Sequence, residues 1–177
     1  GFANAAVVVN VLREDYYRGH PLDGVKFQEA IEKAAFRAGG SNYHSPAQRM
    51  VDFMAGRLSR GDMKSTYEPG VTSARLDKIL PEFISSALKQ AVVDYNKKMR
   101  GFIAPDALVV GVETKTSSPI VMTRDRGLQS VSHPGLFPCG EGAGFAGGIV
   151  SASLDGVRVG RAVLDDAIAT SLAQRLN

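Results

Sequence analysis

The decisive stretch of this sequence is Gly135-Leu-Phe-Pro-Cys-Gly-Glu-Gly-Ala-Gly-Phe-Ala-Gly-Gly-Ile-Val-Ser-Ala-Ser-Leu-Asp-Gly156. Its apolar run, residues 136–138, predicts the end of a buried strand. Six glycines between Gly135 and Gly148 leave the backbone bare, which suits positive φ angles or a ligand lying against the main chain. A helix beginning near Gly147 would direct its free N–H groups and positive dipole end toward that ligand. An anionic or electron-rich group is therefore expected above residues 144–148.

A plainer interpretation of the same residues stays open. Glycine-rich turns between a strand and a helix are common in α/β proteins, and Glu141 would then be an ordinary solvated side chain. The glycines would equally serve a helix start that binds nothing. The wider sequence is needed to choose between these interpretations.

Three segments, in this order, resemble the C-terminal part of a family of bacterial FAD-dependent dehydrogenases whose substrates are largely unassigned. They are Val112-Glu-Thr-Lys-Thr-Ser-Ser-Pro-Ile120, Leu128-Gln-Ser-Val-Ser-His-Pro-Gly-Leu-Phe-Pro138 and residues 139–156. Upstream, Asn42-Tyr-His-Ser-Pro-Ala-Gln-Arg-Met-Val-Asp-Phe-Met-Ala-Gly56 is similar to the inserted domain of that family. In the resembling proteins, the G-x-G-x-x-G fingerprint that holds the FAD pyrophosphate follows a strand upstream of these segments, and Gly142, Gly144 and Gly147, which have the same spacing, belong instead to the glycine-rich turn. The resemblance therefore implies a C-terminal piece of a larger flavoprotein, carrying part of the flavin site.

The resemblance also implies roles for individual residues. It places Glu141 by the ribityl or phosphate region of FAD, where an ionised carboxylate would accept hydrogen bonds directly or through water. Main-chain donors near the pyrimidine end of the flavin would favour its reduced form. A polar loop, residues 116–119, would lie near the flavin ring, although serines before proline are equally common in turns. The expected cofactor-binding residues are Gly140, Glu141, Gly144, Phe145, Ala146, Gly147, Gly148, Ser117 and Ser118.

Other reactive side chains are expected to have bland roles. Arg124 and Arg126 could meet an anionic substrate or a nicotinamide phosphate, but arginines in turns are more often solvated. Cys139 has no second cysteine for a dithiol, so a buried, inert thiol is expected. The three histidines are far apart in sequence and lack metal-ligand spacing, so no metal is expected. No catalytic acid or base can be named.

Composition limits the classes of function. The 177 residues are enough for a sizeable core, and a formal charge of +3 is mild. The longest basic cluster, residues 97–100, has no interleaved aromatic residues, which argues against nucleic acid. A single cysteine, with no signal peptide and no long apolar span, favours a reducing cytoplasm and no membrane partner.

Periodicity and turn residues predict the elements. A buried strand is expected over residues 1–12, and a helix from Asp23 that stops at Gly39-Gly40. A second helix should begin at Pro46, followed by a loop over residues 56–70. Further elements are a short helix at 74–79 capped by Ser73, a helix from Pro81 to Met99, and strands at 107–112 and 120–123. Ile149, Val157, Val163, Leu164, Ala167, Ile168 and Leu172 predict one long helix to the end, with Gly156 and Gly160 allowing close approach to a sheet.

The expected fold class is α+β. Residues 1–14 would be a strand of the FAD-binding domain, residues 15–103 a mainly helical inserted domain on the substrate side, and residues 104–177 the C-terminal part of the FAD-binding domain. The intact protein would transfer hydride through FAD to or from a small-molecule substrate, with NAD(P)H left open as a partner. The chain alone, without the upstream FAD-binding segment, is expected to be inactive and without bound FAD. The rival hypothesis is a non-catalytic helical interaction module with no cofactor.

Overall fold

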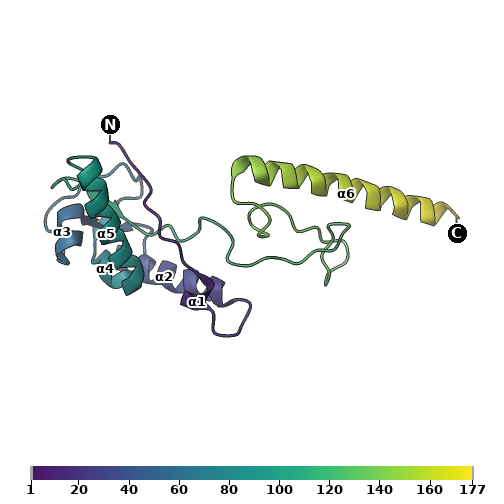
Figure 1. Cartoon of the computed structure of the whole chain (residues 1–177), viewed down its shortest axis with the longest axis horizontal. Coiled ribbons are helices and arrows are strands. Elements are labelled where there is room, and N and C mark those ends of the chain that lie inside the picture. Colours follow the sequence, from purple (N-terminus) through teal and green to yellow (C-terminus); the bar gives the residue numbers. More distant parts are fainter. Residues whose placement is uncertain (1, 177) are drawn as a thin grey trace. The chain divides into compact units, whose positions relative to one another are not determined.

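The computed structural model describes residues 2–176, and the side chains of residues 2–169 and 171. The chain is α+β, as expected, with six helices and three strands in the described part (Figure 1). In chain order the elements are α1 (Arg13–Tyr16), α2 (Asp23–Gly39), β1 (Ser45–Arg49), α3 (Met50–Ala55), β2 (Val71–Ser73), α4 (Leu76–Ile79), α5 (Glu82–Lys98), β3 (Leu108–Val110) and α6 (Ile149–Leu176).

The chain divides into two compact units. Unit 1 comprises Gly1–Arg18 and Lys26–Thr114, and unit 2 comprises Gly19–Val25 and Lys115–Asn177. The assignment of residues 15–103 to an inserted domain, and of the flanking residues to an FAD-binding domain, stays a prediction.

The helix α2 confirms the expectation from its apolar spacing, because Ile31 and Ala35 lie in the core of unit 1. It ends where predicted: Gly40 has φ +103°, and the Ser41 N–H donates to the Phe36 carbonyl at 2.9 Å. A Cβ atom at Gly39 would lie 2.0 Å from the His44 carbonyl oxygen. Only glycine there lets the chain double back tightly into β1.

The sheet of unit 1 has the order β2-β1-β3. The central strand β1 pairs in parallel with β2, Ser45 opposite Val71, and antiparallel with β3, Ala47 opposite Val110. Residues 46–48 are buried, and Phe53 of α3 and Leu76 of α4 are the largest apolar side chains fully enclosed among the described residues. The core of unit 1 therefore forms around β1.

The expectation that Pro46 begins a helix is wrong. Pro46 is the second residue of β1, and its carbonyl accepts the Gly111 N–H at 3.1 Å. A proline near the start of a strand costs one sheet hydrogen bond, and its fixed φ suits both a helix start and a strand. The apolar spacing that suggested the helix belongs only to α3, which begins at Met50.

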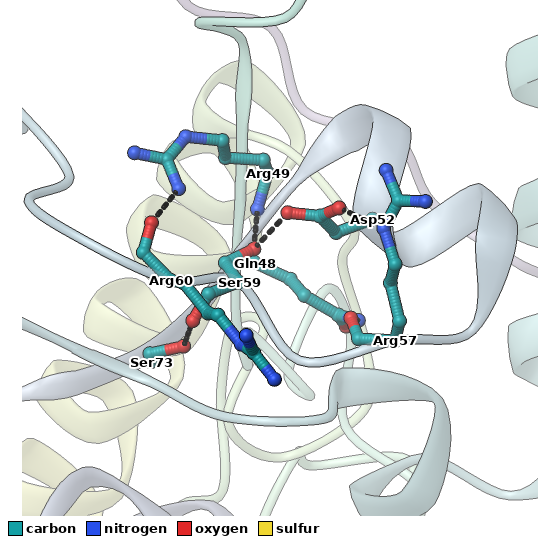
Figure 2. Close-up of polar contacts among 7 residues, drawn as sticks. All are labelled: Gln48, Arg49, Asp52, Arg57, Ser59, Arg60 and Ser73. Atoms are coloured by element: carbon teal, nitrogen blue, oxygen red, sulfur yellow. Dashed lines mark hydrogen bonds and ion pairs between the residues drawn. The ribbon is translucent and has the colours of Figure 1, made fainter.

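The loop predicted at residues 56–70 is present, and a polar network ties it to β1 and α3 (Figure 2). The Arg49 N–H donates to Ser59 Oγ at 2.7 Å, and that hydroxyl donates to Asp52 Oδ2 at 2.8 Å. The Arg49 guanidinium donates to the carbonyls of Arg60 and Asp62 at 2.5 and 2.6 Å. These bonds hold the start of the loop against the sheet.

Gln48 and Ser73 extend this network. Gln48, which is fully buried, donates to the Arg57 carbonyl at 2.6 Å and accepts the Leu76 N–H at 3.0 Å. Hydrogen bonds from Arg57 and then from Ser59 lower the pKa of the Asp52 carboxyl. Ser73 donates to the Ser59 carbonyl at 2.7 Å and belongs to β2, so the prediction that it caps the next helix is wrong. That helix, α4, begins at Leu76 after Arg75.

The strand expected at the beginning of the chain is not formed. Residues 2–11 have no regular structure, and α1 follows (Figure 1). The side chains of Phe2, Val8 and Leu12 are exposed. A β-branched run becomes a strand only where another strand supplies its hydrogen bonds, and the described part of the chain has none beside it. Gly1 lies outside the described residues.

Among the described residues from Lys115 onward, α6 is the one regular element, and the part of the chain between Lys115 and α6 is irregular (Figure 1). The strand expected at 120–123 is replaced by a single bridge between Arg124 and Ser130, and residues 136–138 form no strand. Both runs lack a neighbouring strand long enough to form a ladder, and Val121, Met122 and Leu136 stay exposed. The α6 prediction is confirmed as a helix from Ile149, although the side chain of Leu172 lies outside the described ones.

Candidate functional site

The glycine-rich turn, residues 140–148, folds back on itself just before α6. The Gly144 N–H donates to the Glu141 carbonyl at 2.9 Å, and the Phe145 N–H donates to the Gly140 carbonyl at 3.0 Å. Gly140 and Gly144 have φ of +68° and +83°, values that side-chain-bearing residues rarely adopt. Glycine at these two positions is therefore a requirement of the turn.

The turn lies against the segment that follows Ser118. A Cβ atom at Gly144 would come 2.4 Å from the Ile120 carbonyl oxygen, and the Met122 N–H donates to the Ala143 carbonyl at 3.0 Å. Ser118 therefore stands two residues along the chain from Ile120, whose carbonyl contacts the glycine-rich turn. The Ser118 hydroxyl donates to the Ile120 carbonyl at 2.8 Å, and Ser117 is exposed.

A buried ion pair lies behind the turn. Arg124 donates through two nitrogens to Asp155 of α6, at 2.7 and 3.0 Å, and also to the Pro138 carbonyl at 2.9 Å. The two side chains are only 8% and 6% exposed. Asp155 Oδ2, which accepts the 3.0 Å hydrogen bond from Arg124, also accepts the Gly140 N–H at 2.9 Å. One carboxylate therefore joins α6, the first glycine of the turn and the Arg124 segment.

The charges of this pair are matched. The hydrogen bonds from Arg124, and after them the one from the Gly140 N–H, lower the pKa of Asp155 to about 2. In turn, the Asp155 carboxylate raises the pKa of Arg124. The guanidinium carbon of Arg124 lies 3.6 Å from the centre of the Phe145 ring, which adds a cation–π contact from within the turn. The turn is thus held at its first residue, Gly140, and at Phe145.

The expectation that Arg124 is a solvated turn arginine is wrong, because its side chain is buried against α6. Asp155 was not singled out from the sequence. The sequence feature that could have indicated Asp155 is its position four residues before Val159, on the helix face that is buried in unit 2. A charge on a buried face needs a partner, and that requirement could have pointed to an arginine.

Glu141 is half-buried, and its carboxylate has no hydrogen bond or ion pair to any described side chain or backbone group. Beside it, a Cβ atom built at Gly142 or Gly147 would meet nothing within 4 Å, and one at Gly148 would meet only Ser151 Oγ at 3.8 Å. The turn therefore presents open main chain and one acceptor that is available to a ligand. Hydroxyl donors of a ribityl chain and electron-rich ring atoms fit such a combination of groups.

Cys139 is exposed, so the expectation of a buried thiol is wrong. Pro138, the residue before it, is buried, so the chain comes to the surface at Cys139. Across the described residues, no three histidine, cysteine, aspartate or glutamate side chains gather as metal ligands. None of the described helices is both long enough and apolar enough to cross a membrane.

The fold and the turn together define an α+β protein with a braced, open glycine-rich turn at the start of a long helix. The family model described as FAD-dependent protein, C-terminal domain-like, matches residues 1–116. The chain therefore belongs to this family of FAD-dependent proteins. The matched residues end before the glycine-rich turn begins.

An uncharacterized protein of Clostridium beijerinckii is 41% identical to the chain over 165 residues. That alignment covers 92% of this chain, an extent that includes the glycine-rich turn, but only 31% of the relative. The chain thus spans about a third of the length of this relative.

Proposed function

We propose that this chain is the C-terminal part of a flavoprotein dehydrogenase that transfers hydride to or from a small-molecule substrate. The observation that carries the proposal is the open glycine-rich turn with its unpartnered Glu141 carboxylate, in a chain that belongs to an FAD-dependent family. Bound FAD would supply the hydride chemistry. The chain itself would bind and orient the cofactor.

The residues proposed to hold FAD are those of the turn and the neighbouring loop. Glu141 would accept hydrogen bonds from ribityl hydroxyls or from water at the phosphates. The main chain of Gly140 and of residues 144–148 would face the electron-rich edge of the flavin, and Ser117 and Ser118 would border the ring. The Arg124–Asp155 pair would keep this main chain in place before the cofactor arrives, so that binding costs less ordering entropy.

The remaining assignments follow from this one. An upstream FAD-binding segment of the same protein would complete the site, and the helical part of unit 1 would select the substrate. NAD(P)H is a candidate electron donor or acceptor. The cytoplasm is the proposed compartment, since a chain with a single cysteine forms no internal disulfide.

A second candidate is a non-catalytic interaction module. The observation that favours it is a series of exposed apolar side chains along α6, among them Leu154, Val157, Leu164 and Ile168. An interaction module has no need of an unpartnered carboxylate among open glycines, so the two candidates differ in what removal of Glu141 would do.

The test uses the protein expressed from the complete gene, purified as wild type, Glu141→Gln and Glu113→Gln. Glu113 is an exposed glutamate outside the turn, and it provides the same chemical change as a control. We expect a visible flavin spectrum in the wild type and in Glu113→Gln. In Glu141→Gln, loss of one charge-assisted acceptor should weaken FAD binding roughly tenfold.

The readout is the ratio of released FAD to protein after dialysis, with circular dichroism to confirm folding. A colourless wild-type protein would remove the flavoprotein proposal and favour the interaction module. Equal flavin retention in all three proteins would remove Glu141 from the site.

A further inference from the structure

We propose that residues 5–12 are one strand of a β-sheet whose neighbouring strand is supplied by the upstream FAD-binding segment of the intact protein. The sequence Ala5-Ala-Val-Val-Val-Asn-Val-Leu12 is rich in valine, and in this chain it belongs to no helix or strand (Figure 1). β-Branched residues favour strands where a neighbouring strand can pair with them. The assignment rests on the proposed function, because it requires that upstream segment.

The backbone of this segment is available for pairing. No hydrogen bond joins the main chain of residues 5–11 to any other residue that the structure describes. The Leu12 N–H, by contrast, donates to Asp15 Oδ2 at 2.7 Å at the start of α1. The unpaired run therefore ends where α1 begins, and its length is typical of strands in globular proteins.

Side-chain burial alternates along the segment as it does in a strand. The odd-numbered residues from 7 to 11 are half-buried, whereas the even-numbered residues from 8 to 12 are exposed. Successive side chains of a strand point to opposite faces, so a period of two is expected of extended backbone. Val8 and Leu12, on the exposed face, are 66% and 55% accessible. Apolar side chains on both faces are typical of a strand that is covered on both sides.

The composition of the segment indicates that it is covered in the intact protein. Residues 1–12 contain no charged residue and no proline, and the first charge is that of Arg13. Proteins that leave a strand edge in solvent usually protect it with lysine, proline or an inward charge, because a bare apolar edge pairs with other chains. Residues 5–12 have none of these protections, as expected of a strand with a permanent partner.

The same protein is the favoured source of that partner. This chain spans about a third of the length of its Clostridium beijerinckii relative, so a protein of that length has a large segment besides the aligned one. An FAD-binding segment of the dinucleotide-binding type contains an open sheet, whose edge can accept a further strand. A strand tethered in the same chain has a high effective concentration, which favours it over a second copy.

Hydrogen–deuterium exchange with mass spectrometry tests the pairing by comparing the intact protein with this chain alone. In this chain alone, the amides of residues 5–11 should exchange at close to the rate of an unstructured peptide. In the intact protein we expect them to exchange roughly a hundredfold more slowly, because each exchange then requires the strand to open. Peptides from α2, which is helical in this chain, are the internal reference for folding.

Proline variants separate pairing of the main chain from simple covering. Neighbouring N–H groups of a strand point toward opposite edges, so Val8→Pro and Val9→Pro remove donors from different edges. In the intact protein, at least one of them should abolish the protection of residues 5–11. Val8→Thr is the matched control, because threonine keeps the N–H group and the branched shape at the same position, and protection should remain.

The exchange rates do not depend on a bound flavin. A colourless intact protein in which residues 5–11 are protected would end the flavin proposal and support the strand. Equal exchange of residues 5–11 in both proteins would overturn the strand, whatever the colour. Protection that survives both proline variants would mean covering without pairing, and protection in this chain alone that rises with concentration would identify a second copy as the partner. Either result would overturn the proposal.

Discussion

Asp155 shows how one residue can support a site without facing it. Its carboxylate accepts hydrogen bonds from Arg124 and from the Gly140 N–H, and both groups lie before α6 in the chain. A buried carboxylate is stable only when its charge is met by such donors. We therefore expect the turn and the first part of α6 to keep their geometry together or lose it together.

The pH dependence of unit 2 provides a test of this pair. The pKa of Asp155 is lowered from 3.8 to about 2 in the folded protein. A lowered folded-state pKa contributes stability that is present above the unfolded value and is lost as the pH falls through the folded value. The contribution should therefore be full above about pH 5, decline as the pH approaches 2 and vanish below that, with a size of at most about 2.5 kcal/mol.

Urea unfolding of wild type and Asp155→Asn at several pH values measures that contribution. Asp155→Asn should be the less stable protein at pH 7, and the gap should narrow between pH 4 and pH 2. Asp165→Asn, on the exposed side of α6, should match the wild type throughout. A gap that is independent of pH would contradict the role of the Asp155 charge.

At the residue scale, the sequence predicted the positions of the turn better than the bonds that hold it. The glycines and Glu141 stand together in one stretch, so their proximity needs no tertiary information. Arg124 and Asp155 are 31 residues apart, and their meeting depends on the path of the whole turn. That path follows from packing, which no local pattern encodes.

At the scale of elements, the loop at 56–70 depends on the strand and helix that precede it. Ser59 is buried, and its hydroxyl takes part in two hydrogen bonds, one from the Arg49 N–H and one to Asp52. The carbonyl of the next residue, Arg60, accepts a hydrogen bond from the Arg49 guanidinium. We expect these bonds to protect the loop from proteolysis, because cleavage requires a segment to leave its contacts.

Ser59→Ala should accordingly speed up tryptic cleavage after Arg60 and Lys64. Loss of the Ser59 hydroxyl leaves the buried Asp52 carboxylate without one donor and the Arg49 N–H without its acceptor. This should cost about 1–3 kcal/mol of stability. If local opening limits cleavage, the rate should rise at least roughly fivefold. Limited proteolysis followed by mass spectrometry gives the rates and the sites.

Ser65→Ala is the control for this prediction. Ser65 lies in the same loop, but its hydroxyl accepts only the Tyr67 N–H in an exposed turn, so cleavage should stay near the wild-type rate. Equal acceleration in both variants would mean that the loop responds to any change within it. The bonds to β1 and α3 would then have no special part in holding it.

The elements whose bounds the sequence predicted best are mainly those with long periodic patterns. α2, α5 and α6 each have apolar spacing over 17 or more residues, and β3 has a compact apolar run. β1 and β2 have five and three residues, without alternation, and each is a strand because of its neighbours. The opposite error occurred at residues 2–12, where β-branched residues lack the partner strand that their composition suggests.

At the scale of the whole molecule, α6 has two different faces. Asp155 and Val159 are buried in unit 2, whereas Leu154, Val157 and Leu164 are exposed on other sides of the helix. Gly160 is exposed as well, and a Cβ atom there would meet nothing within 4 Å. Under the proposed function, the exposed surface of α6 packs closely against the FAD-binding segment of the intact protein.

Gly160→Ala distinguishes a covered helix from a bare one, because the same methyl group has opposite effects in the two settings. In this chain alone, alanine should stabilise α6 by about 0.5–1 kcal/mol through its higher helix propensity. In the intact protein, a methyl group forced into a close helix–sheet contact should destabilise by about 1–3 kcal/mol and reduce flavin retention. Thermal unfolding of this chain and of the intact protein measures the change in stability that Gly160→Ala causes in each. Asp166→Ala, at an exposed position on the same helix, is the control. If alanine raises the melting temperature equally in this chain and in the intact protein, nothing approaches α6 at Gly160. The proposal that this helix packs on an FAD-binding segment would then be wrong.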